Sequence, residues 1–583
     1  MKELKFLNRY FVKYRGRLLL GLVITMIATV FRIVVPAQIG ASTNAIDSYL
    51  KGNLPAEMLK AELLNNILTI IGAALLSAFF TFLMRQTIIV VSRYIEFDLK
   101  NVIFKQYEKL SLSFYKQNRT GDLMSRISED VSKVRMYAGP ALMYSTTTVT
   151  LFIVALSYMF YTAPLLTLYA IAPLPILSLS IYKLSIEIHK RSTIVQEYLS
   201  KLTTFTQESF SGISVIKAYG IEPRTNANFN VLSEGSKDKN IRLTQVQALF
   251  FPLMVLLIGA SNLLVVYIGG NQYIDGKIDF GTIVEFLIYV NMLTWPVAIV
   301  GWVSSIIQQA EASQKRINEF LDEVPEIKNH QEVATPVTGA IQFKNVSFTY
   351  PDTNITALKQ VSFKVAPGET LAIVGNTGSG KSTILELVGR LYDIEQGDYL
   401  VDNTIAKELN LMNLRDSIGY VPQDAFLFSD SIKNNIKFGK ENATEDEVIQ
   451  AAKNAAVHKN IVEFNQGYDT VLGERGITLS GGQKQRVSIA RAIIKDPNIL
   501  LFDDCLSAVD TETEEEILQN LHRISADKTT ILVSHRVSSA KNADKIIVLE
   551  EGRIIQQGSH NELVNTDGYY KELYRKQLSE KEI

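Results

Sequence analysis

The stretch Gly375-Asn-Thr-Gly-Ser-Gly-Lys-Ser382 follows the pattern G-x-x-x-x-G-K-[ST]. It lies between an apolar run at 371–374 and a helical pattern at 384–391, which is the strand–loop–helix setting of a phosphate-binding loop. Glycine adopts backbone angles that other residues avoid, so successive N–H groups can turn inward around phosphate oxygens at a helix N-terminus. The stretch therefore predicts a parallel-sheet α/β domain that binds a nucleotide.

This loop and a downstream strand predict the ligands of a nucleotide and its Mg²⁺ ion. Lys381 is expected to reach the β- and γ-phosphates, and Ser382 to bind Mg²⁺. Residues 498–504 form an apolar run that ends in two carboxylates, so Asp503 is expected to hold Mg²⁺ through water. A buried strand followed by a solvated turn is the alternative, which the neighbouring loop disfavours. The expected nucleotide ligands are Gly375, Asn376, Thr377, Gly378, Ser379, Gly380, Lys381, Ser382 and Thr383.

Length and composition indicate several domains and exclude some classes of protein. A chain of 583 residues exceeds what one core usually supports. Its formal net charge of −1 argues against a nucleic acid partner. Cys505 is the single cysteine, so an intrachain disulfide is impossible and a reducing compartment fits. The six histidines show no metal-ligand spacing, so no zinc site is expected.

Six apolar runs in the N-terminal half predict an all-α polytopic membrane domain. Loops 93–138 and 183–245 are rich in Lys and Arg, whereas the short loops 42–62 and 269–280 are not. The positive-inside rule places the basic loops and both termini in the cytoplasm, with the chain in the cytoplasmic membrane. The expected spans are 18–39, 67–91, 141–161, 165–184, 249–268 and 284–307.

Several residues near these spans carry open alternatives. Residues 2–15 predict an amphipathic helix at the membrane interface, with a soluble surface helix as the alternative. Arg32, Arg85 and Glu285 are ionisable residues in or near spans, where they face a cavity, a partner or the interface. A role in substrate binding is one interpretation of these three, and snorkelling to the interface explains Arg85 nearly as well.

The expected domain organisation is a transmembrane domain at 1–322, a linker at 323–338 and a nucleotide-binding domain at 339–583. The linker is polar and contains Pro325 and Pro336. After it, short β-rich runs alternate with helical patterns, as in a parallel-sheet α/β domain. No second phosphate loop follows, and the six-span block is not repeated.

Between the two nucleotide motifs lies Leu479-Ser480-Gly481-Gly482-Gln483, and with it the chain resembles the ATP-binding cassette family. This pentapeptide is the signature of that family and is more specific than either neighbouring motif. The resemblance covers essentially the whole chain and implies ATP and Mg²⁺ as cofactors. In the membrane half, Thr120 to Leu123, Asp130 and 208–220 resemble the intracellular loops of type IV exporters, the six-helix half-transporters.

Further roles are implied by this resemblance. Gln423 matches the residue that senses Mg²⁺, His535 the switch histidine that contacts the γ-phosphate, and Tyr350 the aromatic residue that stacks on adenine. Residues 507–510, with Asp510, resemble the D-loop, and 473–476 resemble an extra loop found before the signature in exporters.

In this family the signature of one cassette completes the ATP site of another, so a second half-transporter is the implied partner. The family usually has Glu directly after the aspartate that holds Mg²⁺, which is Asp503 here. This chain has Asp504 at that position instead. The shorter carboxylate would fall roughly 1–1.5 Å short of the attacking water, and misplacement on that scale costs about 10²-fold in rate. Asp504 therefore resembles the degenerate half of a heterodimeric exporter. A homodimer with two slow or adjusted sites is the alternative.

These observations predict ATP-driven export of an amphipathic compound, such as a drug, a lipid or a lipid-linked molecule. The expected catalytic residues are Asp504, His535 and Gln423, and the expected Mg²⁺ ligands are Ser382, Gln423 and Asp503. Membrane lipids surround the first domain, and no nucleic acid takes part. An ATP-gated channel or sensor with attenuated hydrolysis is the rival interpretation.

Overall fold

The computed structural model of the chain describes residues 2–473, 476, 479–507 and 509–581. Of the loops singled out above, 473–476 and 507–510 lie partly outside the described residues, at Glu474, Arg475 and Ala508. The chain divides into two compact units. The first comprises Met1–Tyr107 and Gly121–Asp322, and the second comprises Glu108–Thr120 and Glu323–Ile583.

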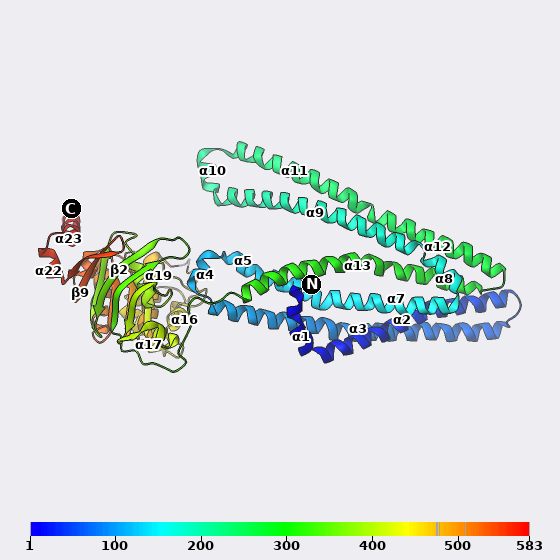
Figure 1. Ribbon diagram of the computed structural model, residues 1–583, viewed down its shortest axis with the longest axis horizontal. Helices are drawn as coiled ribbons and strands as arrows, with labels where there is room; N and C mark the ends of the chain where they lie inside the picture. Colours follow the sequence, from blue (N-terminus) through cyan, green and yellow to red (C-terminus); the bar gives the residue numbers. More distant parts are fainter. Residues whose placement is uncertain (1, 474–475, 477–478, 508, 582–583) are drawn as a thin grey trace. The chain divides into compact units, whose positions relative to one another are not determined.

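The first unit is built almost entirely from long helices (Figure 1). Within it, α2 packs against α7 and α13, and α9 runs beside α11 and α12. The elements before residues 108–120, which belong to the second unit, are η1 (Glu3–Leu7), α1 (Asn8–Lys13), α2 (Arg15–Leu50) and α3 (Ala56–Lys109). Those that follow this segment are α5 (Thr120–Ser125), η2 (Arg126–Asp130), α6 (Val131–Met136), η3 (Tyr137–Ala141), α7 (Leu142–Thr162), α8 (Pro164–Ile171), α9 (Pro173–Ser211), α10 (Ile213–Tyr219), α11 (Glu222–Ala248), α12 (Phe250–Ile274) and α13 (Phe280–Leu321).

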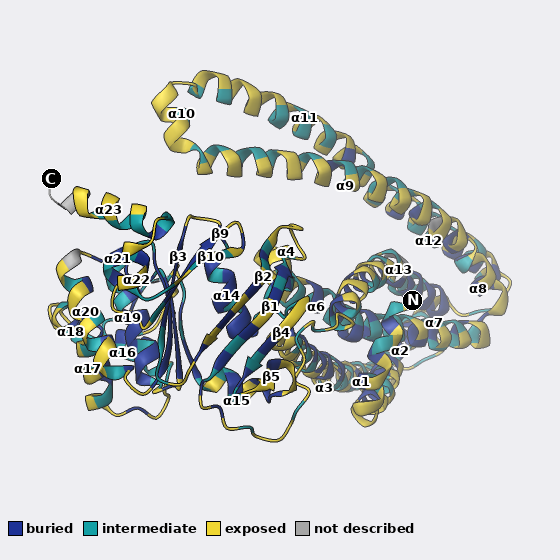
Figure 2. Cartoon of the chain, turned by 60° about the vertical axis from the view of Figure 1, so that its left-hand side comes forward, coloured by how far each residue is buried: buried dark blue, intermediate teal, exposed yellow. Residues whose placement is uncertain are grey.

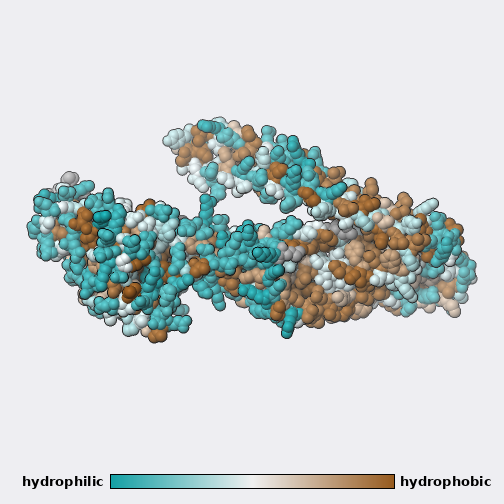
Figure 3. Space-filling model, viewed as in Figure 1, coloured by the Kyte–Doolittle hydropathy of each residue, from teal (hydrophilic) through white to brown (hydrophobic). Residues whose placement is uncertain are grey.

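Six helical segments of the described residues are long and apolar enough to cross a membrane, which confirms the expected six-span domain. Their outer surface is rich in apolar side chains, whereas polar residues dominate the visible surface of the second unit (Figure 3). Apolar side chains facing outward over a helical bundle are what a bilayer stabilises. The segments are Arg15–Leu50, Ala56–Lys109, Thr120–Thr162, Pro164–Ser211, Glu222–Ile274 and Phe280–Leu321.

The N-terminal segment, expected as an amphipathic interfacial helix, forms η1 and α1 and packs on the bundle. Leu4, Leu7 and Tyr10 are buried, and Lys13 pairs with Asp98 of α3 at 2.6 Å. These three side chains are therefore covered by protein, whereas Val12 of the same segment is exposed.

The second unit contains two sheets (Figure 1). A four-stranded antiparallel sheet has the order β2-β1-β4-β5, and a six-stranded sheet has the order β10-β9-β3-β8-β7-β6, in which only β10 is antiparallel. The strands are β1 (Ile341–Thr349), β2 (Thr356–Val365), β3 (Thr370–Gly375), β4 (Gln396–Val401), β5 (Thr404–Ile405), β6 (Ile418–Val421), β7 (Ile499–Asp503), β8 (Thr529–Val533), β9 (Lys545–Glu550) and β10 (Arg553–Gly558). This architecture confirms the predicted α/β domain.

Helix α14 (Lys381–Val388) lies between the two sheets and is mostly buried (Figure 2). Its residues Ile384, Leu385, Leu387 and Val388 join side chains of both sheets in one core. The other helices are α4 (Leu112–Gln117), η4 (Ala406–Glu408), α15 (Leu411–Asp416), α16 (Ile432–Lys437), α17 (Glu445–Asn454), α18 (His458–Val462), η5 (Gly467–Asp469), α19 (Gly481–Ile494), α20 (Thr511–Ile524), α21 (Val537–Ala540), α22 (His560–Asn565) and α23 (Tyr569–Lys581).

Residues 108–120 belong to the nucleotide-binding unit by contact, although the sequence places them inside the first domain. In this segment Leu112 packs against the α14 core, and the Ser113 hydroxyl donates a 2.5 Å hydrogen bond to Glu326. Because contacts over long sequence separations decide this grouping, no local sequence pattern reveals it.

Candidate functional site

The phosphate-binding loop connects β3 to α14, as the sequence predicts. Gly375 and Gly380 have φ of 151° and 99°, in the region where glycine is favoured. A Cβ at either position would collide with a backbone carbonyl, that of Leu549 or that of Ala357. The loop can therefore follow this path only with glycine at both positions.

Lys381 opens α14 and folds back over this loop. Its Nζ donates to the carbonyl oxygens of Gly375, at 3.0 Å, and Asn376, at 2.8 Å. Burial lowers the pKa of the Lys381 ammonium, and the nearby Asp504 and Asp503 carboxylates oppose this shift. A phosphate group in the cavity would offer this buried cation a full negative charge in place of two carbonyl dipoles.

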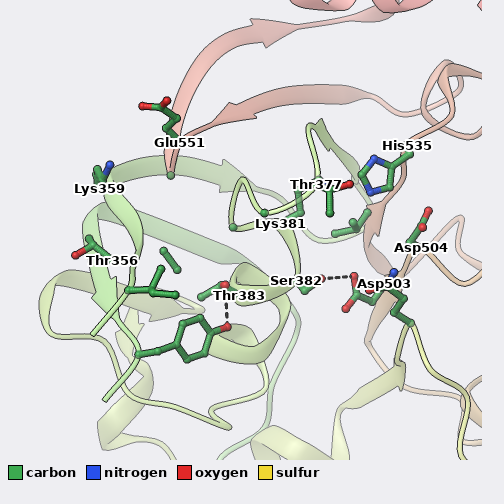
Figure 4. A pocket seen from close by; sticks show the side chains of 18 residues that line it. Thr356, Lys359, Thr377, Lys381, Ser382, Thr383, Asp503, Asp504, His535 and Glu551 are labelled. Carbon is green, nitrogen blue, oxygen red and sulfur yellow. Dashed lines mark hydrogen bonds between the residues drawn. The ribbon is translucent and has the colours of Figure 1, made fainter. Parts of the chain in front are cut away.

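Ser382 and Asp503 meet at the inner wall of the cavity. The Ser382 hydroxyl donates a 2.8 Å hydrogen bond to Asp503 Oδ1 (Figure 4). Burial raises the pKa of the Asp503 carboxyl, because a buried negative charge is poorly solvated. A divalent cation beside the two oxygens would reverse this effect, so the donor set fits Mg²⁺.

Asp504 and His535 follow neighbouring parallel strands and lie on the same side of the cavity (Figure 4). The Asp504 N–H donates to the Val533 carbonyl at 3.0 Å, which ties the end of β7 to β8. Asp504 has a φ of 42°, a left-handed conformation that Asp adopts more readily than most residues. Burial lowers the pKa of His535, and the Lys381 charge acts in the same direction. A neutral imidazole at this position can accept or donate one hydrogen bond.

Tyr350, the candidate adenine-binding residue, lines the same cavity and is held by its hydroxyl. This hydroxyl donates to Glu386 at 2.7 Å and shares a 2.9 Å hydrogen bond with Thr383. Lys116 of α4 lies 5.0 Å from the centroid of the Tyr350 ring and 5.0 Å from that of Tyr392. Helix α4 thereby contacts a wall of the nucleotide site.

A cavity of about 470 Å³ brings most of the predicted residues together. The predicted residues that line it are Tyr350, Thr377, Gly378, Gly380, Lys381, Ser382, Thr383, Gln423, Asp503, Asp504 and His535. Gly375, Asn376 and Ser379 are not in its lining. The Asn376 amide oxygen instead accepts a hydrogen bond from Tyr569 at 3.0 Å.

Other lining residues were not found from the sequence. Thr356, Ala357 and Lys359 come from β2, and Glu551 and Gly552 from the turn between β9 and β10 (Figure 4). The Gly552 N–H donates to the Ser379 carbonyl, and the Lys359 N–H donates to the Gly552 carbonyl. Gly552 is a turn signal in the sequence, but it does not reveal that the turn reaches the phosphate loop.

The signature and Asp510 do not line this cavity. Ser480 instead caps α19: its hydroxyl accepts from the Gln483 N–H, and the Gln483 side chain accepts from the Ser480 N–H. Asp510 caps α20 in the same way through the Thr513 N–H. Hydrogen bonding to Thr513 lowers the pKa of Asp510. The first turn of α19 therefore keeps N–H donors for an acceptor outside this cavity.

Comparisons with known proteins match both units. A family model described as ABC transporter transmembrane region matches residues 18–297, and one described as ABC transporter matches residues 358–507. The multidrug resistance-like ATP-binding protein MdlA of Escherichia coli (strain K12) is 34% identical over 575 residues, which cover 98% of this chain and 96% of that protein.

Two further similarities extend over most or all of the chain. The ATP-dependent lipid A-core flippase of Syntrophus aciditrophicus (strain SB) is 36% identical over 488 residues, 83% of this chain and 81% of that protein. The solved structure of a bacterial Atm1-family ABC exporter with ATP bound has a TM-score of 0.78 and 29% identity, and the match covers 98% of both chains.

Proposed function

The chain belongs to the ABC transporter family, and from this we propose that it is the ATP-binding, slowly hydrolysing half of a heterodimeric exporter. The observation that carries the proposal is the cavity in which Lys381, Ser382, Asp503, Asp504 and His535 meet. The same chain has six helical segments that can cross a membrane. ATP-driven export follows from this combination, and the proposal concerns the site, the partner and the cargo.

Each side chain of the cavity has a role that its position supports. Lys381 binds the β- and γ-phosphates, and the N–H groups at the start of α14 donate to phosphate oxygens. Ser382, Asp503 and Gln423 hold Mg²⁺, which neutralises charge on the phosphates when bound. His535 orients the γ-phosphate, and Tyr350 provides an aromatic face for adenine.

The position of the signature supports a partner subunit. Ser480 and the first turn of α19 lie outside the cavity that the same chain forms. An N-terminal helix turn with free N–H groups suits the γ-phosphate held by another cassette. We therefore assign Leu479 to Gln483 to the ATP site of a second half-transporter, and Asp510 to the contact between the cassettes.

Asp504 supports an unequal pair of sites. It follows β7 where the attacking water would be oriented, but its carboxylate is one methylene shorter than that of Glu. A catalytic group displaced by about 1 Å costs about 10²-fold in rate. This chain would then keep ATP bound, while the partner's site, completed by Ser480 from this chain, carries the turnover.

The proposed cargo is an amphipathic compound, moved outward across the cytoplasmic membrane with both termini in the cytoplasm. The names of two relatives, a multidrug resistance-like protein and a lipid A-core flippase, support this class of cargo. The excess of Lys and Arg in 93–138 and 183–245 supports the orientation.

The test is ATP-dependent accumulation of an amphipathic dye in inside-out vesicles that contain this chain and a candidate partner. Lys381→Ala should remove photolabelling of this chain by an ATP analogue, because it removes the phosphate ligand while α14 stays folded. Lys407→Ala, an exposed lysine of the same unit, is the control. Equal photolabelling in Lys381→Ala and the parent would contradict the site. Accumulation that needs no ATP would contradict export.

A further inference from the structure

A second cavity, of about 860 Å³, lies within the membrane-spanning unit. It is bounded by α2, α3 and α13, and its volume is in the range of small-molecule sites. Its apolar lining residues are Val35, Pro36, Ala74, Ala78, Phe82, Ile288 and Met292. Its polar lining consists of Ser77, Thr81, Asn291 and two arginines, Arg32 and Arg85.

Arg32 lies in the middle of a membrane span. Along α2 the flanking charged residues are Arg17 and Asp47, and Arg32 is midway between them, about 22 Å of helix from each. Within the expected span 18–39, Arg32 lies seven residues, about 10 Å of helix, from the nearer end, so its charge lies inside the hydrocarbon core of the bilayer. A charge at that depth is stabilised only by facing a polar cavity or a partner.

Arg85 reaches the same cavity from α3. It is the single charged residue between Glu62 and Arg93 in the sequence. Neither Arg32 nor Arg85 forms an ion pair or a hydrogen bond with any residue that the structure describes. Both guanidinium groups therefore have all their N–H donors free for a ligand.

The two helices are fixed against each other next to these arginines. Phe31 and Phe80 stack with centroids 5.9 Å apart and planes 5° from parallel, and the Ser77 hydroxyl donates to the Ala28 carbonyl at 3.1 Å. Among the described residues of α2, α3 and α13, Glu285 is the buried acidic side chain. It packs against Gly40 and is not in the cavity lining. Among the described residues, the cavity lining thus combines two cations with an apolar wall and includes no carboxylate.

We propose that this cavity binds the head group of an anionic amphiphile, with Arg32 and Arg85 on a phosphate or carboxylate and the hydrocarbon against the apolar wall. Guanidinium binds both groups through paired N–H donors. The proposal rests on the proposed function, because it names the class of molecule that the exporter carries. An uncharged or cationic amphiphile would leave the two guanidinium groups that line the cavity without an acceptor.

The test is equilibrium binding to the full-length chain in the assembly it forms, in neutral detergent and without nucleotide, by titration calorimetry. The ligands are dioctanoyl phosphatidic acid, zwitterionic dioctanoyl phosphatidylcholine and inorganic phosphate. The acid should bind at least about tenfold more tightly than either of the others. The double variant Arg32→Gln/Arg85→Gln should lose this preference.

Two controls separate head-group binding from a structural role. Arg93→Gln removes an exposed arginine of the same helix α3 and should bind like the parent. The double variant Arg32→Lys/Arg85→Lys keeps the two positive charges but loses the paired N–H donors of guanidinium. It should retain part of the preference for phosphatidic acid. This variant also keeps the test decisive if the glutamine variant does not fold.

Equal affinity for the acid and the choline lipid would overturn the inference. Unchanged acid binding in the glutamine variant would also overturn it. The inference would also be overturned if the glutamine double variant dissociated the assembly but bound the acid normally. The arginines would then pair with the partner subunit instead of a ligand. Export is measured separately through the ATP dependence of dye accumulation, so that either proposal can fail while the other holds.

Discussion

In the proposed function, Asp504 is the residue that sets how fast the chain's own site hydrolyses ATP. Its backbone is left-handed, with a φ of 42°, and is held by the hydrogen bond from its N–H to Val533. The direction of the side chain is therefore set by the strand ends, and its length decides how near the carboxylate comes to an attacking water. A carboxylate acts as a general base only when it lies within hydrogen-bond reach of the water, so the position of Asp504 matters before its pKa does.

Asp504→Glu should raise steady-state ATP hydrolysis of the purified assembly. The longer carboxylate can reach and orient water, and it should recover several-fold of a positional loss of roughly 10²-fold. Asp504→Asn should change little when a partner's site carries the turnover, because a group already out of reach has little to lose. The measurement is phosphate release by both variants, with and without a candidate partner chain. Full activity of the chain alone that disappears in Asp504→Asn would favour the homodimer with two working sites.

At the scale of single elements, α23 shows how a distant segment supports the nucleotide site. The Gln577 side chain donates to the His535 carbonyl at 2.8 Å and accepts from the Val537 N–H at 2.8 Å. At the start of the same helix the Tyr569 hydroxyl donates to Asn376 in the phosphate loop. Helix α23 therefore ties two loops of the cavity to one rigid element.

Tyr569→Phe should weaken ATP binding to the chain's own site by about two- to fivefold. The change removes one hydrogen bond, worth about 0.5–1.5 kcal/mol, and leaves Asn376 and its loop less ordered before ATP binds. Titration of the purified chain with a fluorescent ATP analogue measures the effect. Tyr574→Phe removes a hydroxyl from the same helix, where the ring packs on His560, and it should leave affinity unchanged. Equal affinities in both variants would mean that α23 does not order the loop.

The sequence predicts the local parts of this site but not the contacts between distant elements. The phosphate loop, the carboxylates after β7 and the six spans each follow from local patterns, because a glycine-rich turn, a strand end or a long apolar run is contiguous in sequence. The contact of Lys116 with Tyr350, the tether from Tyr569 and the turn at Glu551 join residues far apart in the chain. Such contacts depend on tertiary packing, which no local period or motif encodes.

At the scale of the whole molecule, the nucleotide cavity and the signature, which we propose to be two halves of ATP sites, do not meet within one chain. The cavity supplies the phosphate ligands, and Ser480 and α19 lie outside its lining. In the proposed function, a second cassette brings its phosphate-bearing cavity to this signature. The proposed partner therefore completes the ATP sites. A change in the signature of this chain should affect hydrolysis at the partner's site, whereas a change in the cavity should affect ATP binding at this chain's own site.

Ser480→Ala should lower ATP hydrolysis of the assembly at least about tenfold, because it removes a donor to the γ-phosphate at the partner's hydrolysing site. The same change also removes a helix cap, worth about 0.5–2 kcal/mol, so a matched control is required. Ser559 caps α22 through the same reciprocal bonding with Glu562, away from the cavity lining. Ser559→Ala should keep activity within about twofold of the parent. Phosphate release and thermal unfolding of both variants separate the two effects. An equal loss of activity in Ser480→Ala and Ser559→Ala would reduce the role of Ser480 to capping, and the signature would then have no part in a partner's site.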